Sequence, residues 1–263
     1  ALAARATAGI DARLVELLEH SAHQTVAQAA LALGEAEAVT SAAWQRLRAR
    51  EQFAVLASPG GEVLKTVIER WRRELAAAAR GYYELHPHDI WLPRGVVASA
   101  LAAQGATAAE IDALVAEAVA DGDFEKSGDR LKLARRKVVL RGLEALAYDK
   151  VQAVLRESSW DPPTLKELPD KVALRPAHVK LALHVLAQED AVVAIGADLT
   201  LHADAVAQAL TVARELCAAQ GEFTLAQFRD RLGTSRRCAV ALLEYFDRQH
   251  HTLRVGDRRV CNE

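Results

Sequence analysis

The sequence of 263 residues contains no methionine, and only 5% of its residues are aromatic. Large β-sheets use many aromatic and β-branched residues, whereas alanine, which is abundant here, is the best helix former. The composition therefore favours helices over a large sheet. Because the chain begins with Ala1 and has no Met, we expect it to be a piece of a longer protein.

Membrane-spanning and metal-binding patterns are also missing. No segment approaches the roughly eighteen uninterrupted apolar residues of a membrane span, and the N-terminal segment has an acidic residue and no clear cleavage pattern. Cys217, Cys238 and Cys261 are far apart and odd in number, without metal-ligand spacing. We therefore expect three small core side chains, a reducing compartment and no metal site. The overall expectation is a soluble, monomeric, cytoplasmic protein without a membrane partner.

Catalytic motifs are absent as well. The sequence has no HExxH motif, no nucleophile pattern and no GxxxxGK[ST] phosphate loop. Isolated histidines are more often structural or surface residues than catalytic ones. We expect no catalytic role for the histidines considered, which are His86, His88, His184, His202, His250 and His251.

Four segments have the pattern of a β-hairpin, with apolar residues on both sides of a tight turn that contains glycine. They are FAVLASPGGEVLKT, GDFEKSGDRLKL, AVVAIGADLTLH and TLRVGDRRVC. Their turn glycines are spaced 68, 68 and 60 residues apart, at Gly60, Gly128, Gly196 and Gly256. This spacing indicates four repeats of one structural unit.

Each hairpin follows a long helical run, a short amphipathic run and a second helical run. The last of these begins at a capping or breaking residue: Thr40 or Ser41, Thr107, Pro176 and Ser235. This order is that of a winged helix-turn-helix domain, in which the hairpin, or wing, covers a three-helix core. We predict an α+β, mainly α chain of four tandem winged helices in an elongated array. A solenoid of helix pairs is the alternative.

We place the four domains at residues 1–75, 76–137, 138–202 and 203–263. The first boundary falls in a segment without a helix breaker before Pro87, so we expect one continuous helix to join the first two domains. The basic cluster ARRKVVLR, residues 134–141, marks the second boundary, and we interpret it as a solvated linker.

Positive charge is concentrated in the fourth repeat, although the chain has a net charge of −2. Arg236 and Arg237 open the helix after Ser235, where the backbone dipole disfavours cations. On a helical wheel, Arg237, Ala241, Glu244 and Arg248 lie opposite the core stripe, and the small alanine leaves room for a partner. The core stripe consists of Ala239, Leu242, Leu243 and Phe246.

The last hairpin adds a second unfavourable arrangement of arginines. A two-residue Gly-Asp turn pairs Arg254 with Arg259, which we expect on the outer face, and Leu253 with Val260 on the inner face. Like charges opposite each other are destabilising, and a polyanion would relieve the repulsion. In the alternative interpretation these arginines are solvated and balanced by Asp230, Glu244, Asp247 and Asp257.

Residues 223–260 resemble the last winged helix of the bacterial selenocysteine-specific elongation factors, the SelB family. The resemblance lies in the segments GTSRR, LLEYFDR and RVGDRRV, with weaker similarity at YYELHP and PPTLKEL further upstream. It implies that the last winged helix binds the selenocysteine insertion (SECIS) hairpin of selenoprotein mRNA. This contact would tether a GTP-dependent factor that delivers selenocysteinyl-tRNA to an in-frame UGA codon on the ribosome. The GTPase, with its GTP and Mg²⁺, would belong to a part absent from this chain.

The resemblance and the charge pattern together define the expected RNA-binding residues. Sequence-specific RNA recognition targets loops and bulged bases. We expect phosphate contacts from Arg236, Arg237, Arg254 and Arg259, and a further base contact from Arg237. His250 and Arg258 are expected to stack on or flank an extruded base. The full set is Arg236, Arg237, Arg248, His250, Arg254, Arg258 and Arg259. A tandem winged-helix DNA-binding protein and a protein-interaction scaffold are the alternatives.

Overall fold

The computed structural model describes residues 9–54 and 62–262 and forms two compact units. The first unit comprises Ala1–Pro87 and Trp91–Arg136, and the second comprises His88–Ile90 and Lys137–Glu263. The boundary at Arg136 falls inside the basic cluster that we interpreted as a linker. The Arg136 guanidinium donates a hydrogen bond to the Pro87 carbonyl and lies 4.3 Å from the Tyr83 ring centroid, so this end of the cluster belongs to the first unit.

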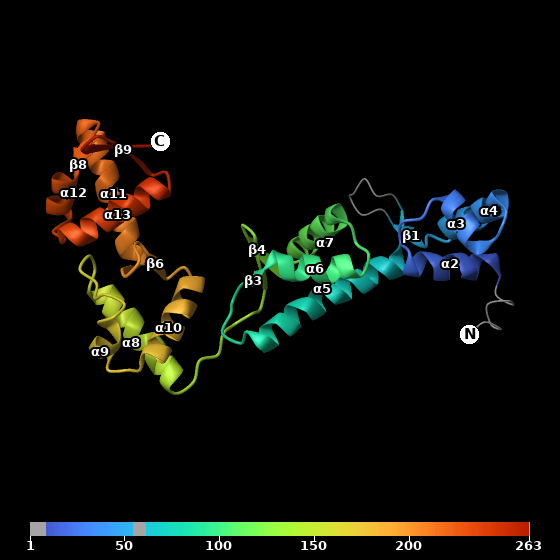
Figure 1. Cartoon of the computed structure of the whole chain (residues 1–263), viewed down its shortest axis with the longest axis horizontal. Coiled ribbons are helices and arrows are strands. Elements are labelled where there is room, and N and C mark those ends of the chain that lie inside the picture. Colours follow the sequence, from blue (N-terminus) through green and yellow to red (C-terminus); the bar gives the residue numbers. More distant parts are fainter. Residues whose placement is uncertain (1–8, 55–61, 263) are drawn as a thin grey trace. The chain divides into compact units, whose positions relative to one another are not determined.

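The first unit contains two repeats, each with three helices before a hairpin (Figure 1). The first repeat consists of α2 (Ile10–His20), α3 (Val26–Leu33), α4 (Glu37–Ala49), β1 (Phe53–Ala54) and β2 (Val63–Leu64). The second consists of α5 (Lys65–Leu85), β3 (Leu92–Pro93), α6 (Arg94–Ala103), α7 (Ala108–Ala120), β4 (Phe124–Ser127) and β5 (Arg130–Leu133). The predicted turn at Gly60 lies outside the described residues.

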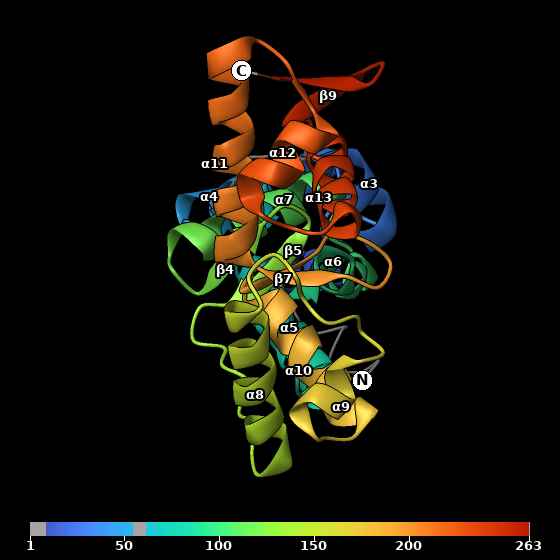
Figure 2. The same ribbon diagram turned by 90° about the vertical axis from the view of Figure 1, so that its left-hand side faces the viewer.

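The second unit repeats this order twice. The third repeat consists of α8 (Leu143–Glu157), α9 (Leu168–Val172), α10 (Pro176–Gln188), β6 (Val192–Ala194) and β7 (Thr200–His202). The fourth consists of α11 (Ala203–Gln220), β8 (Phe223–Thr224), α12 (Leu225–Leu232), α13 (Arg236–Arg248), β9 (Thr252–Val255) and β10 (Arg258–Cys261). Figure 2 shows the β9–β10 hairpin extending from the α11–α13 helices.

Side-chain caps explain five of the twelve helix starts within the described residues. Thr107 and Thr224 each form a capping box at the start of α7 and α12, and the Ser235 hydroxyl accepts a hydrogen bond from the Cys238 amide at the start of α13. The predicted start at Thr40 or Ser41 is wrong. There α4 begins at Glu37, and buried Thr40 donates its hydroxyl hydrogen bond back to the Ala36 carbonyl, 3.4 Å away.

The helix between the first two repeats is continuous, as expected: α5 spans 21 residues from Lys65 to Leu85 without interruption. The short amphipathic run of the third repeat is TLKELPDKV, residues 164–172, but only Leu168–Val172 is helical. Pro169 favours the first turn of a helix, because its nitrogen has no hydrogen to donate to a preceding carbonyl.

Each unit has a core that joins its two repeats, and the second unit has a further core within its third repeat. In the first unit, one core extends from Leu14 of α2 to Leu131 of β5. In the second, one core contains α8–α10, and another joins Ile195 and Leu201 of the third hairpin to the predicted stripe of α13. All four stripe residues are completely buried, which confirms the prediction for Ala239, Leu242, Leu243 and Phe246.

The observed architecture is mainly helical α+β and contains winged-helix elements in the predicted order. The division into four separate domains at the predicted boundaries stays a prediction, because the repeats are grouped in pairs. Among the described helices none combines the length and apolar character of a membrane span. Within residues 9–54 and 62–262, no group of His, Cys, Asp and Glu side chains is arranged to hold a metal ion.

Candidate nucleic-acid interface

The start of α13 places Arg236 at an exposed corner of the fourth repeat. Gly233 ends α12 with a left-handed backbone (φ 68°), a conformation that glycine adopts without steric cost. Ser235 then caps α13, and Arg236 is its first residue. The sequence therefore turns sharply and presents Arg236 beside the hairpin.

A surface groove of about 410 Å³ lies between α12, the start of α13 and the β9–β10 hairpin. Four arginines and two carboxylates contribute to its lining, which leaves an excess of positive charge that favours an anionic ligand. We call it the arginine groove. Its lining residues are Thr224, Leu225, Ala226, Arg229, Arg236, Val240, Glu244, Arg254, Asp257 and Arg259.

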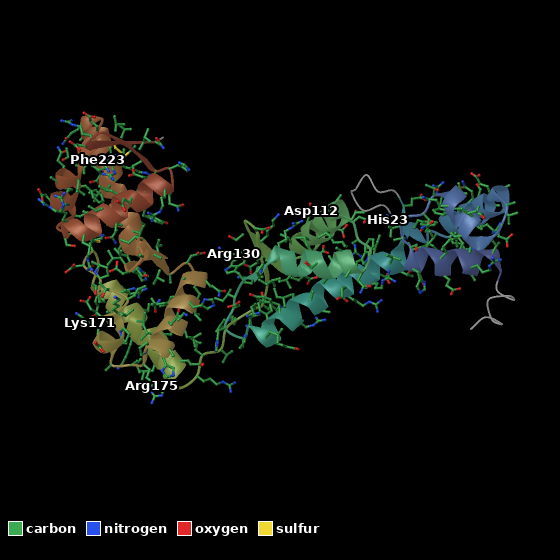
Figure 3. The ribbon with its side chains drawn as sticks, in the orientation of Figure 1. His23, Asp112, Arg130, Lys171, Arg175 and Phe223 are labelled. Carbon is green, nitrogen blue, oxygen red and sulfur yellow. A yellow bond between two sulfur atoms is a disulfide. The ribbon has the colours of Figure 1, made fainter. Side chains whose placement is uncertain are left out.

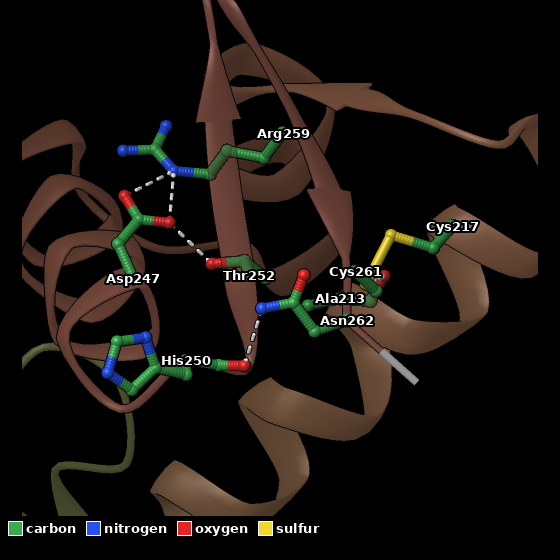
Figure 4. Close-up of a disulfide and its surroundings, with 8 residues drawn as sticks. All are labelled: Ala213, Cys217, Asp247, His250, Thr252, Arg259, Cys261 and Asn262. Carbon is green, nitrogen blue, oxygen red and sulfur yellow. Dashed lines mark hydrogen bonds and ion pairs between the residues drawn. A yellow bond between two sulfur atoms is a disulfide. The ribbon is translucent and has the colours of Figure 1, made fainter.

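The prediction that Arg259 lies on the outer face of the hairpin is wrong. The predicted register is confirmed, since Arg259 pairs with Arg254 and Val260 with Leu253. However, the Arg259 side chain is only 8% exposed, and its Nε lies 3.1 Å from a carboxylate oxygen of Asp247 on α13 (Figure 4). The neighbouring residue Leu253, expected inside, is 56% exposed. The hairpin therefore turns the opposite face toward the helices.

Two contacts hold this face inward. Thr252 is buried and donates a hydrogen bond of 2.5 Å to Asp247, so one carboxylate binds both strands. Cys261, two residues after Arg259 and on the same face, forms a disulfide with Cys217 of α11 (Figure 4). The apolar side chains of Leu253 and Val255 are left at the surface.

The disulfide also corrects the expectation of three unpaired core cysteines. Only Cys238 fits that expectation among the three: it is free and completely buried, and burial raises the pKa of its thiol. Cys217 and Cys261 are covalently joined, with their Cα atoms 6.0 Å apart. The cysteines therefore give no argument for a reducing compartment.

Arg237 and Arg248 contact the third repeat and do not line the arginine groove. An Arg237 guanidinium nitrogen lies 3.5 Å from the Pro162 carbonyl, and one of Arg248 lies 3.0 Å from the Ile195 carbonyl. Ala241 is half-buried, and its Cβ lies 3.9 Å from the position where a Cβ on Gly196 would be. The close neighbour that we expected beside Ala241 is thus this chain's own third hairpin.

Local electrostatics support this position of Arg237. Hydrogen bonds from the Thr164 backbone and hydroxyl lower the pKa of Glu167 in the third repeat, and the positive charge of Arg237 lowers it further. Arg237 is exposed and does not line the groove, and its charge makes a smaller contribution to this lowered pKa than the Thr164 hydrogen bonds.

The remaining expected residues lie at the edge of the groove or outside it. Arg254 lines the groove and donates a hydrogen bond to the Gly256 carbonyl. Arg258 pairs with Glu222 at 2.6 Å, outside the groove lining. His250 is exposed, with a left-handed backbone (φ 60°), and its carbonyl accepts a hydrogen bond from Asn262.

Sequence reasoning missed Arg229. It lies in the last turn of α12, pairs with adjacent Asp230 at 2.6 Å and lines the groove. The missed signal was the helical position of Arg229, which lies on the flank of the buried stripe of Phe228 and Leu232, about 80° from its middle.

Comparisons with known proteins confirm the resemblance that the sequence indicated. Residues 215–261, which contain all the residues that line the groove, match the family described as "Elongation factor SelB, winged helix". The chain is 26% identical over 197 residues to the selenocysteine-specific elongation factor of Escherichia coli (strain K12), covering 75% of this chain and 31% of that protein. The chain thus spans about a third of that relative's length.

Two solved structures are also similar. One is the mRNA-binding domain of elongation factor SelB from E. coli in complex with SECIS RNA, at 26% identity and a TM-score of 0.43, covering 47% of this chain and all of that one. The other is a bacterial selenocysteine-specific elongation factor, EF-Sec, at 16% identity and a TM-score of 0.39, covering 81% of this chain and 32% of that one. The similarity to the C-terminal region of SelB rests on the family match and the curated relative.

Proposed function

We propose that this chain is the mRNA-binding part of a selenocysteine-specific elongation factor and that its fourth repeat binds a SECIS-type RNA hairpin. The observation that carries the proposal is the coincidence of two features. The lining of the arginine groove presents the exposed arginines Arg236 and Arg254 on one surface of the fourth repeat, and that repeat contains the residues matched to the SelB winged helix.

The arginines that line the groove have different roles in this proposal. Arg236 and Arg254 are exposed and come from two elements, so together they can hold phosphates on two sides of a loop or bulge. Arg229 can add a third contact from α12. Arg259 is held by Asp247, and its role is to fix the hairpin against α13 rather than to bind phosphate.

The remainder of the proposal concerns the longer protein. The four repeats would act as tandem winged helices in a monomeric array between a translational GTPase and the mRNA hairpin. GTP, Mg²⁺, selenocysteinyl-tRNA and the ribosome would be partners of the GTPase part, since this chain has no phosphate-loop sequence and we assign it no enzymatic step. A translational role also places the protein in the cytoplasm.

A binding titration tests the proposal. We expect Arg236→Ala combined with Arg254→Ala to weaken binding of a SECIS-type hairpin by more than about tenfold. The slope of log affinity against log salt should fall by about 1.5, because two phosphate contacts no longer release counterions. Arg237 and Arg259 are poorer choices, since both are engaged within the chain. Fluorescence anisotropy with labelled RNA at several salt concentrations gives both quantities.

A matched control is Arg73→Ala combined with Arg80→Ala on α5, which removes the same charge from exposed positions of the first unit. This variant should bind the hairpin like the parent chain. Equal affinity of the groove variant and the parent would contradict the assignment of the groove. Equally tight binding of a DNA duplex of the same length would favour a DNA-binding protein, and failure to bind either nucleic acid would favour an interaction scaffold.

A further inference from the structure

The second repeat has its own cationic surface, on the outer face of the β3–β5–β4 sheet. The register pairs Leu92 with Leu131 and places Trp91, the residue before β3, beside Lys132. The Arg130 guanidinium carbon lies 5.3 Å from the centroid of the Trp91 ring, and the Lys132 Nζ lies 5.0 Å from it. Trp91 is half-buried. Figure 3 labels Arg130 at the end of the first unit that contains the β3–β5–β4 sheet. We call Trp91, Arg130 and Lys132 the tryptophan face.

Nearby carboxylates only partly neutralise this face. Glu125, from the paired position on β4, lies 2.8 Å from the Lys132 Nζ and is about half exposed. Asp129 is exposed at the turn. Among the described residues, no carboxylate forms an ion pair with Arg130, whose charge stays available beside the indole ring.

The fourth repeat shows that a winged helix of this chain does not need such a face for folding. Its hairpin has the same Gly-Asp-Arg turn and the same register, with Arg258 at the position of Arg130. At the position of Trp91 it has Glu222, which pairs with Arg258 at 2.6 Å. The second repeat thus has an aromatic ring at a position where the fourth has a neutralising carboxylate.

The combination of an aromatic ring and adjacent cations on a strand surface is suited to single-stranded nucleic acid. Every base has a π-face that can stack on an indole, and cations beside the ring can hold the flanking phosphates. Cation–π contacts at exposed sites are weak, so exposed Arg130 can turn from the ring to a phosphate at little cost. Lys132 is 18% exposed and paired with Glu125, so it binds a phosphate only by exchanging this partner. A helical duplex offers no unpaired base to Trp91.

We propose that the tryptophan face is a second RNA-binding surface, which stacks one unpaired base on Trp91 and binds its flanking phosphates through Arg130 and Lys132. The site lies in the first unit and is separate from the arginine groove of the second. It does not depend on the function proposed for the fourth repeat.

The test uses the full chain with Arg236→Ala and Arg254→Ala, so that the groove does not contribute, and a fluorescein-labelled ten-nucleotide single-stranded RNA. We expect Trp91→Leu to weaken binding by about tenfold, as the loss of one stacked base predicts, and Trp91→Tyr to retain most of it. Arg130→Ser combined with Lys132→Ser should lower the salt slope by about 1.4, as expected for two contacts to a single strand. Far-UV circular dichroism of each variant controls for folding.

Intrinsic fluorescence gives an independent measurement. Trp44 and Trp71 are buried, and the Trp160 indole donates a hydrogen bond to the Ala205 carbonyl, so RNA should quench mainly Trp91. The quenching should disappear in Trp91→Tyr, which still binds. Unchanged affinity in Trp91→Leu, or no binding of the oligonucleotide at low salt, would overturn the proposal. Either result would leave hairpin binding by the arginine groove untouched.

Discussion

Arg259 is buried against α13 by its ion pair with Asp247 and determines which face of the last hairpin points inward. The position of Arg259 in the repeat explains why its side chain is buried. The Gly-Asp-Arg turns of the second and fourth hairpins have the same register, and Arg259 stands where the second repeat has Leu131, which is 1% exposed. An arginine at such a core position requires a carboxylate partner, because an unpaired buried charge is strongly unfavourable.

The ion pair leads to a prediction of unequal effects from its two partners. Asp247→Ala should destabilise the second unit by about 2 kcal/mol, because Arg259 would remain buried without a counter-charge and Thr252 would lose its acceptor. Arg259→Leu should cost about 1 kcal/mol or less, because leucine fills the equivalent position of the second repeat. Urea unfolding followed by circular dichroism measures both. Equal losses, or none for Asp247→Ala, would contradict this account of Arg259.

Part of this arrangement was predictable from the residues. The helical wheel correctly gave the buried stripe of α13, and Asp247 was among the carboxylates named as balancing charges. The choice of face for Arg259 was wrong because the hairpin was considered alone. Comparing it with the second hairpin would have aligned Arg259 with an apolar residue, and that comparison was available in the sequence.

At the scale of elements, local signals predicted the register of the last hairpin and most of the helices. Capping residues and turn glycines act over a few residues, so their effects can be read from a short segment. The disulfide between α11 and β10 could not be read in this way, because Cys217 and Cys261 are 44 residues apart and meet only after the repeat has folded. The contact of Arg248 with the third hairpin also depends on packing between repeats.

The disulfide should make a large contribution to the stability of the fourth repeat. In the chain-entropy account, a cross-link over this separation stabilises the folded state by about 4 kcal/mol. We expect dithiothreitol to lower the urea midpoint of the parent chain and to leave that of Cys217→Ala combined with Cys261→Ala unchanged. Alkylation of the unfolded parent chain should modify one cysteine before reduction and three after it. Three modifications without reductant would show that the bond is absent.

At the scale of the whole molecule, the sequence period predicted four repeats, whereas the structure groups them in two compact units. The sequence period reflects secondary structure, which recurs every sixty-odd residues. The cooperativity of unfolding depends instead on which repeats share a hydrophobic core. One core includes both repeats of the first unit, and another joins Ile195 and Leu201 of the third hairpin to Phe246 of α13. A core shared in this way couples the stabilities of its two repeats.

We therefore expect two unfolding transitions in differential scanning calorimetry rather than four. Leu201→Ala in the third repeat and Phe246→Leu in the fourth should lower the same transition, because both side chains are completely buried in one core. A loss of about 2–3 kcal/mol corresponds to a shift of about 8 °C for a unit of this size. Leu101→Ala, completely buried in the first unit, is the matched control and should lower only the other transition. If the Leu201 and Phe246 variants instead shift different transitions, the third and fourth repeats fold independently, and the contacts of Arg237 and Arg248 are too weak to couple them.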